Sequence, residues 1–521
     1  MFRPSKFNLR RSSISRGTTG LVFVLLAAGF CTVLHDICDP FWFDEVITVI
    51  MCRLPNATEI WKALEHAADS NPPFFYLVTR FTLHLVPDEY LGYRLPALIG
   101  FLGTVSCVYM ILSERVSRLS ALVGATFILC TPLAQLACEA RPRGVMIACV
   151  ACAVLAWQRI EDSRLYAVLV ALSLGAALSL HYYAVLVWPA FLAAEASVWM
   201  IQRRFRVSAW ASIAAGALPL LPFFRLLSAM REYYGKHFWA QPSLTNMVFA
   251  HDYLFKLSGN WGLPLAVVIT VAILRFSIGK KVTPGRPLRL VVAEDAFKVE
   301  EKVLMLMLLC LPEFATVIAK VGHLGMTAPY MLPGVVGAAM AVGYLTSKVS
   351  RPAAGLLLAL FLMTYALSSS AVVVRALKGN LLEKRNAASL ETQALVAEIG
   401  QTELPIVISN GMRYLPMAIY ASGDVRRRIY SISDRSASVA YSPARSDSVD
   451  LELLVLRQYF PMQVDDFDGF ASRHREFILV TGGAMGGDLE WLPARLVHDG
   501  DEVKLLSMAG GSPIYRVTIK P

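Results

Sequence analysis

Long apolar stretches of about 17 to 22 residues recur along the first three quarters of the chain, and they constrain its fold more than any other feature. A helix of that length crosses a hydrocarbon layer of about 30 Å. Of the 521 residues, 56% are hydrophobic and 17% are charged, whereas a soluble domain carries about 25% charged residues. The stretches are too numerous for a single anchor, so the sequence predicts a polytopic α-helical membrane protein.

The apolar stretches and their breaks predict eleven spanning helices. They lie near residues 20–36, 94–112, 119–137, 144–158, 165–180, 182–201, 209–225, 261–278, 303–319, 328–346 and 353–374. With the N-terminus inside, the inside loops hold roughly twenty Lys and Arg and the outside loops about nine, in agreement with the positive-inside rule. We therefore interpret the formal charge of +10 as topogenic, and we expect no nucleic-acid partner.

The odd number of spans predicts a cytoplasmic N-terminus and an extracytoplasmic C-terminal part. Residues 1–376 form the predicted transmembrane domain, whose first outer loop covers residues 37–93. The apolar run 72–78 in that loop is too short for a span and favours an interfacial or re-entrant helix. In residues 377–521, strand-like runs near 405–409 and 477–481 alternate with helical patterns. A small extracytoplasmic α/β domain is expected there.

A cluster of acidic and aromatic residues follows the first predicted span. Its sequence is Asp39-Pro40-Phe41-Trp42-Phe43-Asp44-Glu45. Carboxylates beside aromatic rings at a membrane surface can remain ionised close to a lipid headgroup. A solvated loop with an interfacial aromatic belt has the same composition, so the spacing alone leaves both interpretations open.

Further motifs distinguish these two interpretations. They are Asn71-Pro72-Pro73 followed by Phe74-Phe75-Tyr76-Leu77 and Arg80, then Tyr93-Arg94-Leu95-Pro96-Ala97-Leu98, Glu139-Ala140-Arg141 and His181-Tyr182-Tyr183. Together with Asp44-Glu45, over about 200 residues, their order and common outside location resemble the C-type membrane glycosyltransferases. That superfamily includes the protein O-mannosyltransferases and the lipid A aminoarabinose transferases.

The resemblance implies a helical membrane core that takes a sugar from a polyprenyl-phosphate donor at the extracytoplasmic face. It places the catalytic base on Asp44, with Glu45 sharing that task or holding a cation. A base in hydrogen-bond reach of an attacking hydroxyl contributes a factor of about 10²–10⁴. The expected reaction is a single inverting transfer of a hexose or pentose to a glycan, lipid or protein hydroxyl. A bacterial inner membrane is the expected location.

The resemblance also implies groups that bind the rest of the substrate. Arginine suits a leaving phosphate because its donors form a fixed fork. The predicted phosphate ligands are Arg80, Arg94, Arg141 and Asn71, and the predicted substrate-binding residues are Glu139, His181 and Tyr182. For each arginine, snorkelling to the interface is the competing interpretation. Asp44 and Glu139 also offer oxygen ligands suited to magnesium or manganese, although no ligand spacing indicates a metal.

The sequence departs from the family pattern in two places. Asn71 stands where many relatives have His or Lys before the paired prolines, and Pro329-Tyr330 stands where relatives often have Arg-Tyr. Phosphate recognition is therefore expected to be rearranged. The candidates to compensate are Lys320, His323, Arg231 and Lys236.

Two other functions are compatible with a polytopic chain. A transporter or flippase is favoured by Glu313, a carboxyl group within a predicted span. Transporters often have two related halves, but the sequence shows no such halves and its acidic residues lie mostly at the outer rim. A non-catalytic scaffold leaves the Asp44-Glu45 and Glu139-Arg141 motifs unexplained. The balance favours the enzyme.

Overall fold

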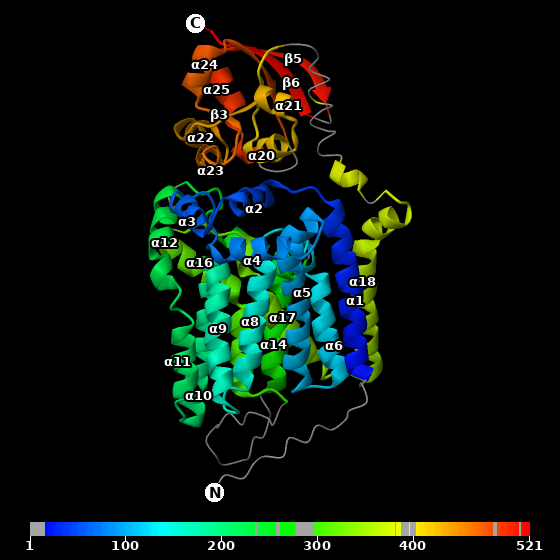
Figure 1. Cartoon of the computed structure of the whole chain (residues 1–521). Helices are drawn as coiled ribbons and strands as arrows, with labels where there is room; N and C mark the ends of the chain where they lie inside the picture. The colour runs from blue at the N-terminus through cyan, green and yellow to red at the C-terminus, as the bar shows by residue number, and fades with distance from the viewer. Residues whose placement is uncertain are drawn as a thin grey trace.

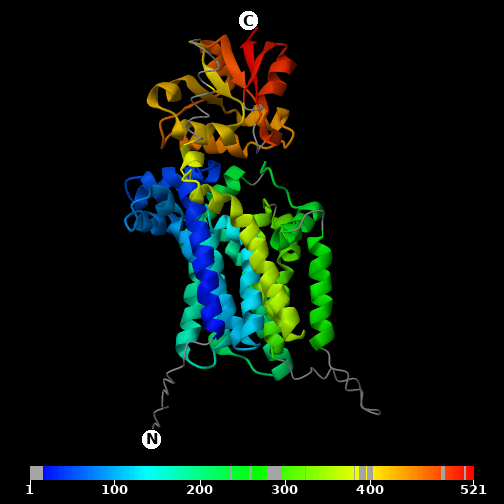
Figure 2. The same ribbon diagram turned by 90° about the vertical axis from the view of Figure 1, so that its right-hand side faces the viewer.

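The structure, a computed structural model, consists of a helical part followed by an α/β part (Figures 1 and 2). It describes residues 16–234, 237–256, 261–277, 296–322, 324–380, 382–386, 395, 403–482, 487–509 and 512–520. The α/β part lies at one end of the helical part, and the N-terminus lies at the opposite end.

The upright helices of the helical part begin and end close to the apolar stretches of the sequence. They are α1 (Arg16–Cys38), α5 (Glu89–Ser113), α6 (Arg118–Phe127) with η1 (Ile128–Cys130), α8 (Arg143–Gln158), α9 (Arg164–Leu180), η2 (Tyr182–Val187) with α10 (Trp188–Gln202), α11 (Val207–Ala215), α12 (Leu220–Tyr234), α14 (Gly262–Ser277), α15 (Val299–Leu309), α16 (Leu311–Gly322), η3 (Ala328–Met331) with α17 (Gly334–Thr346), and α18 (Arg351–Leu377). Two shorter helices are α7 (Leu133–Leu136) and α13 (Leu244–Phe255).

Helices of membrane-spanning length and composition are fewer than the predicted spans. Among the residues that the structure describes, four helices qualify, over Gly17–Cys38, Glu89–Ser113, Tyr182–Gln202 and Arg351–Leu377. Two bent pairs also pass when each is taken as one unit, α11 with α12 at 44° and α15 with α16 at 58°. Every predicted span overlaps a helix or a helix pair. The prediction of a polytopic helical protein is therefore confirmed, while the number of eleven crossings stays a prediction.

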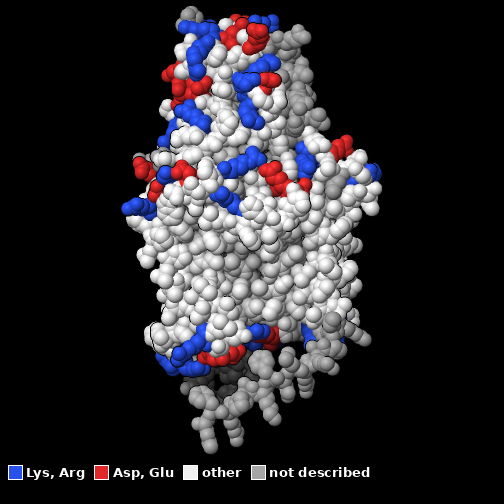
Figure 3. All heavy atoms as spheres, viewed as in Figure 1, with Lys and Arg blue, Asp and Glu red and all other residues white. Residues whose placement is uncertain are grey.

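On the face shown in Figure 3, a belt without charged side chains crosses the middle of the helical part. Lys, Arg, Asp and Glu gather above and below this belt. The hydrocarbon interior of a bilayer excludes charged groups, so such a belt is typical of a protein that spans it. The side of the belt that carries the α/β part also carries the outer loop (Figure 1).

The outer loop folds into three short helices, α2 (Phe43–Arg53), α3 (Ala57–Glu65) and α4 (Phe74–Leu83). The side chain of Asn56 caps α3 by accepting a hydrogen bond from the backbone N–H of Glu59. Helix α4 includes most of the apolar run that was expected to be interfacial or re-entrant, and ten residues are too few to span a bilayer. These helices carry the acidic motif.

The α/β part is built on a six-stranded sheet with the strand order β3-β2-β1-β4-β6-β5. The strands are β1 (Ile406–Ile408), β2 (Ile429–Ile432), β3 (Gln463–Asp465), β4 (Glu476–Val480), β5 (Glu502–Ala509) and β6 (Ser512–Thr518). The helices are α20 (Gly411–Tyr420), α21 (Gly423–Arg428), α22 (Arg435–Tyr441), α23 (Ser448–Leu456), α24 (Phe467–Arg473), η4 (Gly487–Leu489) and α25 (Leu492–Asp499). Strands β1 to β4 pair in parallel, and β6 and β5 pair antiparallel at one edge. Helical connections between parallel strands explain the alternating sequence pattern.

The α/β part contacts the outer loop through its helices α20 and α23. The hydroxyl of Tyr420, the last residue of α20, accepts a hydrogen bond of 2.6 Å from the backbone N–H of Phe41. It also lies 3.3 Å from the hydroxyl of Tyr90. Just beyond α23, the Tyr459 hydroxyl lies 3.0 Å from Nδ1 of His66. These contacts hold the α/β part over the acidic motif.

Helices α5 and α8 approach so closely that no side chain fits between them at Gly100 and Gly144. A Cβ atom at Gly100 would collide with the backbone of Gly144, and one at Gly144 would come within 2.6 Å of the Ala97 carbonyl oxygen. We expect Gly100→Ala to lower the free energy of unfolding in detergent by about 1–3 kcal/mol, because the two helices must separate. Gly355→Ala on α18 is the control, since nothing lies within 4 Å of that Cβ. Equal stability of the two variants would contradict this packing.

Candidate active site

Asp44 lies in the first turn of α2, at the surface between the outer loop and the spanning helices. Its side chain is 21% exposed, so solvent or a substrate reaches the carboxylate. Oδ2 is 3.5 Å from Nε of Arg141 and 3.4 Å from Nη2 of Arg143. The backbone carbonyl of Asp44 also accepts a hydrogen bond of 3.1 Å from Arg141. Two arginines thus fix the position of one accessible carboxylate.

Glu45, the neighbour of Asp44, is buried in an ion pair with Arg94 of α5. The two carboxylate oxygens accept hydrogen bonds of 2.7 Å each from Nε and Nη2 of the guanidinium. Each side chain is 1% exposed. Oε1 also accepts from the backbone N–H of Ala140 at 2.6 Å. The carboxylate is therefore fully engaged, which suits a residue that positions the site rather than one that takes up a proton or holds a cation.

The guanidinium of Arg94 donates to several groups within the protein. Besides the two bonds to Glu45, it donates to the backbone carbonyls of Asp36, Asp39 and Pro40 at 2.7, 2.8 and 3.3 Å. Arg94 thereby ties α5 to the end of α1 and the start of the outer loop, and its role in phosphate binding stays a prediction.

Arg141 forms a second buried ion pair, with Asp69 in the turn before α4. Its Nη1 lies 2.7 Å from Oδ2 of Asp69. Asp69 also accepts from the Tyr76 hydroxyl at 2.7 Å and from the Asn71 side-chain amide at 3.0 Å. Burial opposes ionisation, but the charge of Arg141 and these hydrogen bonds outweigh it and lower the pKa of Asp69. Asn71 therefore orients Asp69, and the sequence analysis did not identify this aspartate.

The Nε atom of Arg141 has no hydrogen-bond partner in the described part of the chain. It faces Oδ2 of Asp44 at 3.5 Å, which is an ion-pair distance but too long for a good hydrogen bond. A buried donor without a hydrogen bond is costly and calls for an explanation. An anionic group of a substrate beside Asp44 would supply the missing acceptor.

Arg143 joins Asp44 to Glu139 and was also missed by the sequence analysis. Its Nη1 lies 3.0 Å from Oε2 of Glu139, and its Nη2 reaches Asp44. The side chain is 12% exposed, so it is more accessible than Arg141. Glu139 lies in the turn before α8 and Arg143 is the first residue of that helix, so no helical periodicity in the sequence indicated their contact.

Burial raises the pKa of Glu139 to about 7, against the opposing effect of Arg143. The negative charges of Glu45 and Asp44 raise it further. Glu139 therefore changes its charge close to neutral pH, and with it the strength of its pair with Arg143.

Arg80, the fourth predicted phosphate ligand, lies on α4 away from this network. It donates to the backbone carbonyls of Leu54 and Pro55, both at 3.2 Å, and so closes the turn between α2 and α3. Among the proposed substitutes, Lys320 and Arg231 are exposed and form no ion pair with a described residue of the site. His323 and Lys236 lie outside the described residues.

His181, Tyr182 and Tyr183 follow α9, and their side chains have different surroundings. Nδ1 of His181 accepts from the backbone N–H of Tyr183 at 3.2 Å. Burial, assisted by Arg143 and Arg141, lowers the pKa of His181 to about 3, so the ring is neutral. Tyr182 packs on Phe223, whereas Tyr183 stacks on Tyr330 with 3.9 Å between ring centroids. The predicted role of His181 and Tyr182 in substrate binding stays a prediction.

The predicted metal ligands, Asp44 and Glu139, do not form an open set of oxygen donors. The guanidinium of Arg143 lies between them and contacts both. A divalent cation at that place would have to displace a positive charge. Within the described ranges, no group of three or more His, Cys, Asp or Glu residues is suited to a metal ion. The residues present do not fit the predicted metal.

Glu313, the residue that favoured a transporter, pairs with His251. Its Oε1 lies 2.8 Å from Nε2 of the imidazole. The pair lines a mainly apolar cavity with residues of α14, separate from Asp44. No repeated half or chain of ionisable groups accompanies it among the described helices.

Comparison with known proteins supports the predicted family resemblance. A family model described as dolichyl-phosphate-mannose-protein mannosyltransferase matches residues 70–228. Crystal structures of ArnT from Cupriavidus metallidurans, bound to undecaprenyl phosphate and in the apo state, both have a TM-score of 0.57. They share 13% and 12% identity with the chain, and each match covers 96% of this chain and 98% of ArnT.

An oligosaccharyltransferase from Archaeoglobus fulgidus, solved with Zn and sulfate, has a TM-score of 0.40 at 12% identity, over 88% of this chain and 67% of that chain. No curated protein matches the sequence. The predicted resemblance is confirmed by the family match and by the ArnT-like fold over nearly the whole chain.

The Glu45–Arg94 pair leads to a prediction for stability. Glu45→Ala would leave a guanidinium buried without its counter-charge, and we expect a loss of about 3–5 kcal/mol in the free energy of unfolding. Glu59→Ala breaks the exposed pair with Lys62 and is expected to cost at most about 1 kcal/mol. Thermal unfolding of both variants in detergent distinguishes them. A Glu45→Ala protein as stable as Glu59→Ala would show that the pair does not hold the loop.

Proposed function

Because the chain has the fold of the C-type membrane glycosyltransferases, we propose that it transfers a monosaccharide from a polyprenyl-phosphate donor to an acceptor hydroxyl group. The observation that carries the proposal is that Arg141 and Arg143 both lie within ion-pair distance of Asp44. A carboxylate that can accept a proton thus lies beside cations that can stabilise a leaving phosphate. The transfer reaction requires both.

The reaction assigns a separate task to each group. The acceptor oxygen forms a bond to the anomeric carbon of the sugar while its proton passes to the Asp44 carboxylate. The bond between the anomeric carbon and the phosphate oxygen breaks, and its electron pair stays on the phosphate. Arg143 and Nε of Arg141 stabilise the charge that develops there. Attack opposite to the leaving group inverts the anomeric configuration in a single step.

Donor binding would also free Asp44 from its ion pairs. In the structure its carboxylate lies within ion-pair distance of both guanidinium groups. A bound phosphodiester carries its own negative charge and competes for the same donors. As the arginines turn to the phosphate, the Asp44 carboxylate becomes free to accept a proton. Glu45, held by Arg94, keeps α2 in place during this exchange.

The position of the site suggests where the reaction occurs. Asp44 lies at the end of the helical part that carries the α/β part, opposite to the N-terminus (Figure 1). With the N-terminus in the cytoplasm, as the loop charges predict, this face is extracytoplasmic. The donor would reach the site from the membrane, and the acceptor from the aqueous side. A bacterial inner membrane remains our proposed location.

Asp44→Asn tests the proposed base. The amide is nearly isosteric with the carboxylate but cannot accept the proton, so we expect the transfer rate to fall by about 10²–10⁴ with the fold unchanged. The assay incubates purified protein with radiolabelled polyprenyl-phosphate sugars, hexoses and pentoses, and a panel of acceptors.

Asp88→Asn is the matched control for this assay. It lies on the same side of the protein and caps α5, and an asparagine caps a helix equally well. We expect the control to retain wild-type transfer. Equal transfer by Asp44→Asn and the wild type would remove the base assignment, and a wild type that transfers none of the sugars would count against the function.

The pKa of Glu139 leads to a prediction for pH dependence. Above about pH 7 its carboxylate is ionised and retains Arg143, whereas below that pH the neutral acid releases it. We therefore expect the KM for the donor to rise as the pH passes upward through about 7. Glu139→Gln keeps the neutral form, so its KM should stay low and constant from about pH 6 to about pH 8. If the KM of Glu139→Gln changes with pH as that of the wild type does, another group causes the pH dependence.

A further inference from the structure

Helices α20 and α23 lie on the side of the α/β part that faces the outer loop. Figure 1 shows α23 and α20 on the face of that part that points toward α2 and α3. Contacts at both ends of the interface fix this arrangement, between Tyr420 and Phe41 and between Tyr459 and His66. Leu451 and Leu453 of α23 belong to the same buried apolar cluster as Phe43 and Val46 of α2. The two parts therefore share a core.

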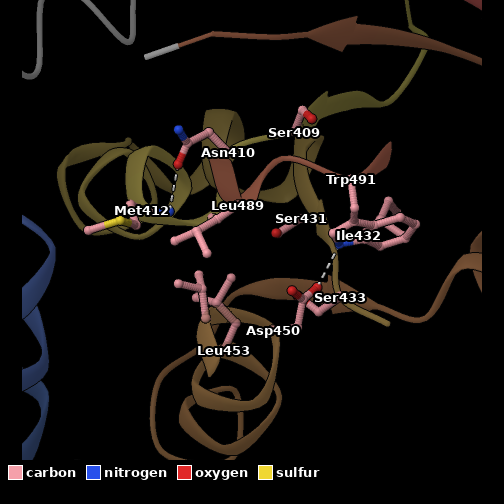
Figure 4. Close-up of a pocket in the computed structure, with 12 residues that line it drawn as sticks. Ser409, Asn410, Met412, Ser431, Ile432, Ser433, Asp450, Leu453, Leu489 and Trp491 are labelled. Carbon is pink, nitrogen blue, oxygen red and sulfur yellow. Dashed lines mark hydrogen bonds between the residues drawn. The ribbon is translucent and has the colours of Figure 1, made fainter. Parts of the chain in front are cut away.

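The side chains of α23 divide between two faces. Asp450 and Leu453, three residues apart, line a small pocket at the carboxyl ends of β1 and β2 (Figure 4). Asp450 accepts a hydrogen bond of 2.9 Å from Nε1 of Trp491 there. Glu452 is not part of that pocket. Successive side chains on an α-helix are rotated by about 100° about the helix axis. The Glu452 side chain is therefore rotated by more than about 100° from the mean direction of Asp450 and Leu453, which face the pocket.

The carboxyl group of Glu452 therefore lies on another side of α23 than the pocket, and the charges of Asp69, Asp44 and Arg141 act on it. The side chain is partly buried, and it forms no hydrogen bond or ion pair with any residue that the structure describes. Its oxygens are not among the fully buried atoms that lack a hydrogen-bond partner, so a molecule at the site can reach the carboxyl group.

We propose that Glu452 is a specificity-determining residue, which hydrogen-bonds to a hydroxyl group of the transferred sugar beside Asp44. The inference rests on the proposed function, because it takes the sugar as the molecule at this place. With its phosphate at Arg141 and Arg143, the donor presents its sugar toward the aqueous side, where α23 lies. The α/β part would thus complete the site as well as cover it.

The electrostatics of Glu452 suit a hydroxyl group. Burial raises its pKa well above the usual range, and the charges of Asp69 and Asp44 raise it further. This shift favours the protonated form, which has one O–H donor and a carbonyl acceptor. A hydroxyl group of a sugar also donates and accepts, so the two form complementary hydrogen bonds.

The test compares Glu452→Ala and Glu452→Gln with the wild type. The donors are a polyprenyl-phosphate sugar that the wild type transfers and the series of its monodeoxy analogues. Loss of one such hydrogen bond is expected to lower kcat/KM about 5- to 100-fold in Glu452→Ala. Glu452→Gln, which retains a donor and an acceptor, should stay within about threefold of the wild type. Glu476→Ala, at an exposed position of β4, is the control for the α/β part.

The deoxy series separates recognition from a merely structural role. If Glu452 binds one hydroxyl group, the wild type transfers the analogue that lacks this hydroxyl group more slowly than the parent sugar. Glu452→Ala should transfer both sugars equally well, because the hydrogen bond is already lost and removing its second partner costs nothing more. The inference is overturned if Glu452→Ala has wild-type kcat/KM, or if it discriminates among all analogues as the wild type does. Both of these results leave the proposed function intact, whereas a wild type without transfer overturns that function itself.

Discussion

The structure of the site depends on the buried ion pair between Glu45 and Arg94. Its hydrogen-bonded neighbours are five backbone groups, four between Asp36 and Trp42 and one at Ala140. The pair thus joins the start of the outer loop to α5 and to the turn before α8, which are distant from it in the sequence. A charge buried in this way must remain paired, since the loss of either partner leaves the other without compensation. The cost of separation therefore holds α2 in one orientation. That orientation places the adjacent Asp44 where solvent and a substrate can reach it.

The two ion pairs beside Asp44 differ in how deeply they are buried. The Arg141–Asp69 pair is enclosed, and its charges are fixed by each other and by Tyr76. Arg143 and Glu139 are more accessible, and the pKa of Glu139 lies near neutral pH. The enclosed pair can preorganise the site at little cost during the reaction, while the accessible pair can exchange partners when an anion binds. This division suits a site that must bind a phosphate and release it.

The fold was largely predictable, because each of its parts follows from a local pattern. Apolar stretches of membrane length correspond to α1, α5 and α18, and the alternation after residue 377 corresponds to the parallel strands and helices around β1 and β4. Bends such as the one between α15 and α16 were not predicted, since hydropathy averages over a window and does not record a change of direction. The pairing order of the strands was equally inaccessible, because it depends on contacts between distant segments.

The sequence by itself determined that the chain is a polytopic helical protein, that its acidic and arginine motifs resemble those of one superfamily, and that Asp44 is the residue to test. Only the tertiary structure decided which charges meet. It assigned Arg94 to Glu45, brought Asp69 and Arg143 into the network, and directed Arg80 to backbone carbonyls of the outer loop. The physical reason is that hydropathy and local motifs act over a few helical turns. The partner of a buried charge is set by packing between segments up to several hundred residues apart.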